Sequence, residues 1–344
     1  MMNASELQQE LFLAIKANIP SHLSAAEEIA KVLNASVDSI YRRMRGEKTI
    51  SLDELYTLCS HYKISSDQLM KIQTGTFNFG GSLLNEKTFQ YEAYLNSILN
   101  NLSYFNSFKE KEYYFLGKDF PIFHHFHIRE IAAFKYFFWT KTIFNFPGFA
   151  NKRFNFNLYP DELWELGKKI IAGYNQLPSI EIWNVENINI AIRQIEFYRD
   201  GQMFEADDDV VKLYETWEKL IDHVEKQAER GYKFQFGDPE MKPLGEYKVY
   251  FNEVILGDNS MLAVLNGVKL AVITHTNINY MLTRDLNFTE NLYDYIQSLM
   301  RRSTLISKVS EKERSKFFNI LRGKIVRRKE AVLAKLKTVK NKSS

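Results

Sequence analysis

Residues 24–46 contain two short amphipathic segments joined by a very tight turn, and this pair constrains the fold more than any other feature. Apolar residues recur at helical spacing in both segments: Ala26, Ile29, Ala30, Leu33, Val37, Ile40 and Met44. The turn between them needs a residue that tolerates positive φ, and Asn34 is the most tolerant type after glycine. Ala30 is small enough for the two helices to cross closely. The pattern predicts a helix-turn-helix unit.

Signals for helix starts recur around this unit. A Ser or Thr followed three residues later by Glu or Gln predicts a capping box, in which two side chains satisfy the free amides of a first helical turn. Four pairs fit this spacing: Ser5 with Gln8, Ser24 with Glu27, Ser51 with Glu54, and Ser65 with Gln68. Ser36 is the expected N-cap of the third helix, with Asp38 close to its positive end. We therefore predict a five-helix domain over residues 1–73.

The predicted third helix carries side chains suited to DNA recognition. Residues on the first turn of such a helix can reach base edges, and arginine can bond a guanine edge or clamp a phosphate. On this basis we expect DNA contacts from Ser36, Val37, Asp38, Ser39, Tyr41, Arg42, Arg43, Arg45 and Lys48. The alternative is a helical bundle that uses the same faces to bind another protein.

The stretch AEEIAKVLNASVDSIYRRMRGEKTISLDEL, from Ala26 to Leu55, resembles the lambda-repressor-like (XRE/Cro) helix-turn-helix regulators, of a type common in Bacteroidetes-like bacteria. The resemblance implies double-stranded DNA as partner. Asn34 replaces the usual turn glycine, and Arg43 stands where the family often has a bulky apolar residue, which leaves the facing of Arg42 and Arg43 open. KDFPIFHHFHIREIAAFKYFFW, from Lys118 to Trp139, resembles the C-terminal halves of the same regulators, for which it implies no defined activity.

A glycine-rich polar segment, residues 74–82, predicts a linker to a second, larger domain at 83–338, followed by a basic disordered tail at 339–344. Helices are expected near 86–108, 128–144, 161–174, 181–199, 208–230, 289–302 and from 310 onward. The β-rich residues 246–275, with Asn266-Gly267 as a hairpin turn, predict a three-stranded antiparallel meander. The expected fold is thus mostly α, with a helix-rich α+β second domain that contains only this small sheet.

Charge is unevenly distributed along the chain. Residues 301–344 hold 15 Lys and Arg against 3 Asp and Glu. The predicted last helix places Phe317, Leu321 and Ile325 on one face and leaves Arg322, Arg327, Arg328 and Lys329 elsewhere. Two interpretations remain open: these cations touch DNA phosphates, or they form an ordinary solvated face.

No pattern of residues predicts catalysis. Cys59 is the only cysteine and lies at an apolar helix position, which excludes a CxxC-type zinc site. His124, His125 and His127 lie close together, but their spacing does not place all three on one face and their neighbours are aromatic, so we expect core residues and no metal or cofactor. The apolar run Ile131–Phe144 is too short and too charged to span a bilayer, and no signal peptide is seen.

These features predict a cytoplasmic, sequence-specific transcriptional regulator that acts as a homodimer. Its second domain is expected to mediate oligomerisation or to sense a signal from a small-molecule or protein effector. A protein-interaction module of antitoxin or scaffold type is the alternative, and a DNA-tethered enzyme is a third hypothesis.

Overall fold

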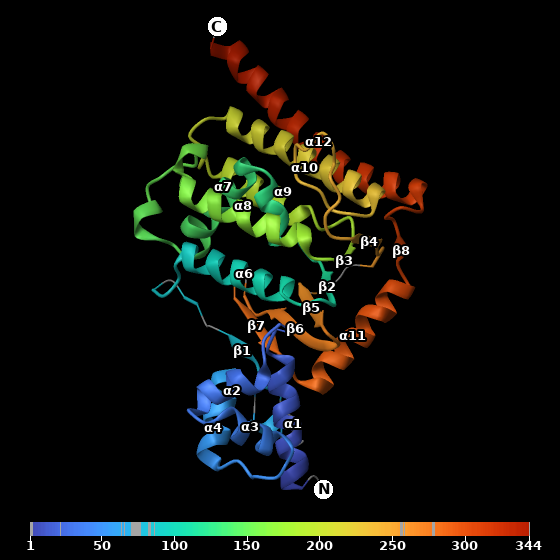
Figure 1. Cartoon of the computed structure of the whole chain (residues 1–344). Helices are drawn as coiled ribbons and strands as arrows, with labels where there is room; N and C mark the ends of the chain where they lie inside the picture. The colour runs from blue at the N-terminus through green and yellow to red at the C-terminus, as the bar shows by residue number, and fades with distance from the viewer. Residues whose placement is uncertain are drawn as a thin grey trace.

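The computed structural model describes residues 3–20, 22–62, 64, 66–69, 77–81, 84–85, 87–254, 257, 259–276 and 279–343. Its N-terminal unit contains α1 (Ala4–Ala17), α2 (Ala25–Leu33), α3 (Val37–Met44), α4 (Leu52–Tyr62) and α5 (Ser66–Leu69) (Figure 1). Each of the first four helices contributes apolar side chains that are fully or almost fully buried. These include Leu11, Ile15, Ile29, Ile40 and Leu58, which form the core of this unit.

The start of α1 differs from the expected capping box. Asn3, not Ser5, is the N-cap: its side chain accepts the N–H groups of Ser5 and Glu6, both at 3.0 Å, and Glu6 accepts the N–H of Asn3 at 2.8 Å. An Asx residue caps at least as well as serine, so the helix begins earlier. Gln8 is therefore not a capping residue; it is buried on the apolar face of α1.

The other capping boxes have mixed outcomes. Ser51 and Glu54 form the predicted reciprocal pair at the start of α4, with N–H to oxygen distances of 3.0 and 3.1 Å. Ser24 occupies the N-cap of α2, but its side chain makes no capping hydrogen bond. Ser65 and the side chain of Gln68 lie outside the described residues.

In its described residues, the larger unit combines helices with an eight-stranded sheet. Its main helices are α6 (Tyr91–Asn106), α7 (Arg129–Phe138), α8 (Asp161–Gln176), α9 (Asn189–Asp200), α10 (Asp208–Arg230), α11 (Leu286–Arg301) and α12 (Glu311–Ser343). The strands are β1 (Gly80–Gly81), β2 (Lys111–Leu116), β3 (Ser179–Trp183), β4 (Tyr247–Phe251), β5 (Ser260–Leu265), β6 (Val268–Thr274), β7 (Tyr280–Thr283) and β8 (Thr304–Leu305). Short 3₁₀ segments occur at η1 (Ile122–His127), Pro147–Phe149 and Phe156–Leu158, and a π-helical turn (Trp139–Ile143) extends α7.

The observed sheet is larger than the small antiparallel meander that the sequence predicts, and it is mixed rather than purely antiparallel. Its strand order is β1-β7-β6-β5-β2-β3-β4-β8, with β2, β3 and β4 parallel and the other pairings antiparallel. The turn at Asn266-Gly267 joins β5 to β6 as predicted, with φ of 47° and 83°. However, β4 pairs with β3 and β8 rather than with β5, so the meander of antiparallel strands that are consecutive in the chain is β5-β6-β7.

Strand β3 shows why the sequence predicts fewer strands than the sheet contains. All five of its residues are buried, because parallel strands inside a sheet are covered on both faces and lose the alternation that marks a half-exposed strand. The helix predicted over 181–199 is therefore wrong in its first part, and α9 starts only at Asn189. The helices predicted near 161–174 and 208–230 match α8 and α10.

Helices cover the two faces of the sheet unequally (Figure 1). One face packs in a large aromatic core with α6 to α10 and α12. The other packs against α11, through residues such as Tyr114, Ile182 and Ile296. Among the described residues, no helix combines the length and apolar character needed to cross a membrane.

Several of the C-terminal cations lie on α12 and are paired with acidic residues elsewhere in the larger unit. Arg322 pairs with Asp222 and Glu225 of α10, and Arg328 pairs with Glu196 of α9 at 3.1 Å. Lys324 contacts Glu186 at 2.9 Å, and Lys329 contacts Glu218 at 2.6 Å. Of the four cations expected on a solvated or DNA-contacting face, Arg322 and Lys329 are instead half-buried and paired with acidic residues from distant sequence positions. Arg327 and Arg328 are exposed as expected, although Arg328 also has an acidic partner. The helix also continues through 339–343, where a disordered tail was expected.

Candidate nucleic-acid interface

The turn between α2 and α3 has the backbone conformation that the sequence predicts. Asn34 adopts φ 48° and ψ 48°, the left-handed region. Its position ends α2, and the N–H of Ala35 donates to the carbonyl of Ala30 at 3.0 Å, which turns the chain into α3 within a few residues. Ala30 is buried at this crossing.

Helix α3 presents one exposed and one buried face. Ser36 caps it by accepting the N–H of Ser39 at 3.3 Å, and Ile40 anchors its inner side in the core. Seven of the nine predicted contact residues are exposed: Ser36, Val37, Asp38, Tyr41, Arg42, Arg45 and Lys48. Ser39 is half-buried.

Arg43 is the exception, because its side chain is only 6% exposed. Its guanidinium donates to the backbone carbonyl and hydroxyl of Ser39 and to Oε1 of Glu54, the last at 2.5 Å. Arg42, in contrast, is 54% exposed. Arg42 is thus the arginine that faces outward. Arg43 links α3 to α4 through Glu54 and does not belong to the candidate DNA-binding surface.

Glu54 is held in its charged form by the groups around it. Partial burial by itself raises the pKa of this carboxyl, but the hydrogen bonds from Ser51 and Arg43 outweigh it and leave the pKa below its ordinary value. One carboxylate therefore caps α4 and also partners the buried guanidinium that belongs to α3.

Gln8 is a second anchoring residue, and sequence reasoning missed it. Its Nε2 donates to the carbonyls of Arg43 at 2.7 Å and Lys48 at 2.8 Å, and its Oε1 accepts the N–H of Ile50 at 3.0 Å. The signal was available: Gln8 lies three residues before Leu11 on an otherwise apolar helix face, and a polar group buried there must find partners. These bonds hold the end of α3 and the following loop against α1.

Glu47 is an acidic neighbour of two of the exposed cations. Glu47 lies 2.6 Å from Nε of Arg45 and 3.5 Å from Nε of Arg42, and hydrogen bonding to Arg45 is the main reason that the pKa of Glu47 is lowered. Exposed pairs of this kind contribute little to stability, so a phosphate could replace Glu47 as partner at small cost.

The histidine cluster of the larger unit is a buried network. Nε2 of His124 lies 3.1 Å from Glu181, a fully buried carboxylate that also accepts hydrogen bonds from the hydroxyls of Tyr174 and Tyr247. Burial raises the pKa of Glu181, but His124 and the tyrosine hydrogen bonds reverse this and lower it. The part of the chain that the structure describes contains no group of three potential ligands arranged for a metal ion.

Lys233 completes this network, and sequence reasoning identified neither it nor Glu181. Its ammonium donates to the carbonyls of Tyr174 and Leu177 at 2.8 and 2.6 Å and to the hydroxyl of Ser179 at 2.7 Å. Burial lowers the pKa of Lys233 to about 7. The network links α8, β3 and β4 inside the core of the larger unit.

Comparisons of this chain with protein-family models, with curated proteins and with solved structures find no match. The functional interpretation therefore rests on the arrangement of its residues.

Proposed function

We propose that this protein is a sequence-specific DNA-binding transcriptional regulator, with α3 as its recognition helix. The observation that carries the proposal is the combination, on one short helix, of an exposed polar and cationic face with an inner side anchored by Ile40, Arg43 and Gln8. A recognition helix needs both properties, since base contacts require side chains held in a fixed register.

The exposed side chains divide by position into two groups. Val37 and Asp38 lie on the first half of α3, which is the part that enters the major groove in helix-turn-helix proteins, and Tyr41 follows one turn later on the same exposed face. Arg42 lies on the same exposed face and is long enough to bond a guanine edge. Arg45 and Lys48 lie beyond the end of the helix, where contacts to phosphates are expected.

The larger unit is proposed to mediate dimerisation or signal sensing. A single small helix-turn-helix unit contacts few base pairs, and specific affinity generally requires two half-sites about one helical turn apart. The two units are joined by a segment whose far end, β1, is paired with β7 of the large sheet.

Selection of bound sequences from a random DNA pool, with the full chain, tests the proposal. We expect enrichment of one sequence, bound with strong salt dependence, and loss of about 1–3 kcal/mol of specific affinity in Arg42→Ala. Arg153→Ala, which removes an exposed arginine from the larger unit, is the matched control and should bind normally. A pool without enrichment, or full affinity in Arg42→Ala, would contradict the assignment.

A protein-interaction module is the second candidate, and one observation favours it. Leu52 and Tyr56 of α4 are 82% and 75% exposed, one helical turn apart. Such an apolar pair is suited to a protein partner. Absence of enrichment in the DNA pool, together with a stable protein complex that Leu52→Ser disrupts, would favour this function.

A further inference from the structure

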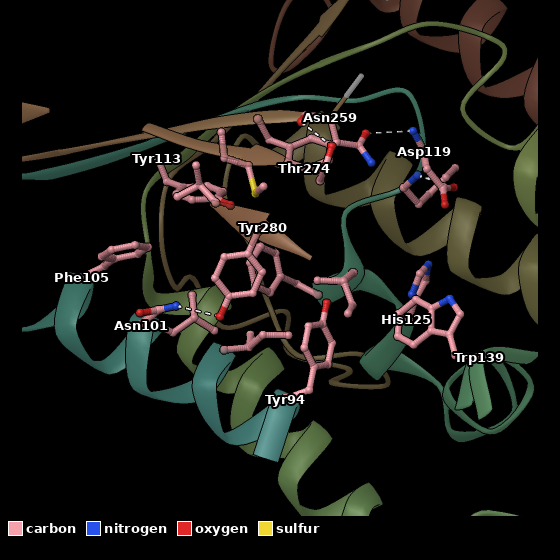
Figure 2. Close-up of a pocket in the computed structure, with 18 residues that line it drawn as sticks. Tyr94, Asn101, Phe105, Tyr113, Asp119, His125, Trp139, Asn259, Thr274 and Tyr280 are labelled. Carbon is pink, nitrogen blue, oxygen red and sulfur yellow. Dashed lines mark hydrogen bonds between the residues drawn. The ribbon is translucent and has the colours of Figure 1, made fainter. Parts of the chain in front are cut away.

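A candidate ligand site lies in the larger unit, between α6 and the sheet. A cavity of about 140 Å³ opens there, lined by side chains of α6, β2, β5, β6 and β7 and by the segment that contains η1. Figure 2 shows Phe105 and Asn101 toward one end of it and Asp119, His125 and Trp139 toward the other. No part of the candidate DNA-binding surface belongs to this cavity.

The size and the walls of the cavity restrict what it can hold. An apolar cavity of about 150 Å³ is large enough for benzene. Most of the wall is apolar or aromatic, including Ile98, Phe123 and Val272. The hydroxyl of Tyr280 is already engaged by Ser97 at 2.8 Å and by Asn101 at 3.3 Å, so this end offers mainly ring surface. A single six-membered aromatic ring fits both the volume and the lining.

The opposite end of the cavity is polar and contains His125. This side chain is only 3% exposed, and neither of its ring nitrogens has a hydrogen-bond partner among the described residues. A buried polar group without a hydrogen-bond partner costs folding free energy. A ligand that supplies such a partner to His125 would therefore gain binding free energy. Burial, with Lys135 and His124 nearby, lowers the pKa of His125 well below its ordinary value. The ring is therefore neutral, with one nitrogen that donates and one that accepts.

Asp119 determines which ligand charge the polar end of the cavity can accommodate. Its carboxylate accepts the N–H of Phe120 at 2.8 Å and lies 3.8 Å from the ammonium of Lys135. A ligand carboxylate would be repelled by Asp119 and could only accept hydrogen bonds. A ligand ammonium would compete with Lys135, which is already present. A hydroxyl group carries no charge and can donate and accept at once, which matches the neutral imidazole.

We propose, building on the signal-sensing part of the proposed function, that this cavity binds a small single-ring phenol, with the ring between α6 and the sheet and the hydroxyl at His125. The site is tested without DNA, so failure of DNA recognition and failure of this site are separate results.

The test compares phenol with two analogues by titration calorimetry on the full chain. Toluene has the shape of phenol with a methyl group in place of the hydroxyl, and benzoate replaces it with a charged group. We expect phenol to bind with a Kd of about 1 mM or below, toluene at least tenfold more weakly, and benzoate not measurably. Equal affinity for phenol and toluene, or no binding of phenol, would overturn the proposal.

Two substitutions assign the site. His125→Phe should reduce phenol affinity at least tenfold, to the level of toluene. His127→Phe is the matched control, because His127 is buried in the same 3₁₀ segment η1 but does not line the cavity, and it should bind phenol as the unmodified chain does. Ile98→Phe fills the cavity from α6 and should abolish binding of both phenol and toluene, which provides an answer even if His125→Phe does not fold. Unchanged phenol binding in Ile98→Phe would overturn the location.

Discussion

The guanidinium of Arg43 lies 2.5 Å from Oε1 of Glu54, and Oε2 of the same carboxylate accepts the backbone N–H of Ser51 at 3.0 Å. One acidic side chain therefore caps α4 and fixes α3 to it. Because Arg43 is almost fully buried, loss of Glu54 would leave a buried charge without its acidic partner.

We therefore expect Glu54→Ala to destabilise the N-terminal unit by about 2 kcal/mol, from the lost cap and the unpaired guanidinium together. Amide hydrogen exchange of α3 and α4 in the full chain measures this. Glu47→Ala, which removes the exposed acid beside Arg45, is the control and should leave the exchange rates unchanged. Equal protection in Glu54→Ala and the unmodified chain would show that the pair does not hold the helices together.

Arg45 and Lys48 are expected to contact phosphates rather than bases. Alanine at either position should weaken binding to selected and unrelated DNA alike and reduce the slope of log affinity against log salt by about 0.9. Binding measured at four or more salt concentrations gives this slope. A loss confined to the selected sequence would instead assign base contacts to the altered residue.

The end of α12 is expected to take no part in DNA binding. The cations Arg322, Arg328 and Lys329 are paired with acids of α9 and α10, and the C-terminal end of α12 lies at the opposite end of the molecule from the N-terminal unit (Figure 1). Removal of residues 335–344 should leave the salt slope unchanged. A decrease of this slope by one unit or more would show that residues 335–344 contact DNA phosphates.

A fragment of residues 77–344 is expected to form the dimer that two half-sites require. The cut precedes β1, because β1 pairs with β7 and belongs to the large sheet. Light scattering at concentrations above those used for DNA binding should give twice the mass of one fragment. A monomer under these conditions would place the dimer contacts in the N-terminal unit or on the DNA.

Histidine burial predicts a dependence of stability on pH. Burial lowers the pKa of His223 to about 3, whereas an unfolded histidine titrates near 6.5. Between these values the unfolded chain binds the extra proton, so stability falls as pH decreases from about 6.5. Between pH 7.5 and 5.0 the contribution of His223 to this loss is about 2 kcal/mol.

His223→Phe should therefore reduce the loss of unfolding free energy over this interval by about that amount, measured by urea unfolding at the two pH values. His22→Phe, at an exposed position of the N-terminal unit, is the control and should lose as much stability as the unmodified chain. The same loss in His223→Phe as in the control would show that His223 accepts a proton in the folded state.

Local features were readable from the sequence because neighbouring residues determine them. The positive φ of Asn34, the capping pair of Ser51 and Glu54 and the turn at Asn266-Gly267 each involve residues within a few positions of one another. Helices with a strong 3.6-residue pattern, such as α8 and α10, were found for the same reason, since one face of each must be buried.

The tertiary structure alone decided which segments meet. Nothing near β3 specifies that it lies between β2 and β4, because a strand buried on both faces shows no alternation and its partners lie more than 60 residues away in the chain. Likewise, the sequence pattern of α3 left Arg42 and Arg43 equivalent, and the acidic partner of the buried Arg43, Glu54, comes from another helix. The cavity beside His125 depends on α6, η1 and the strands β2, β5, β6 and β7 coming together, and such a space exists only where side chains from distant segments fail to fill it.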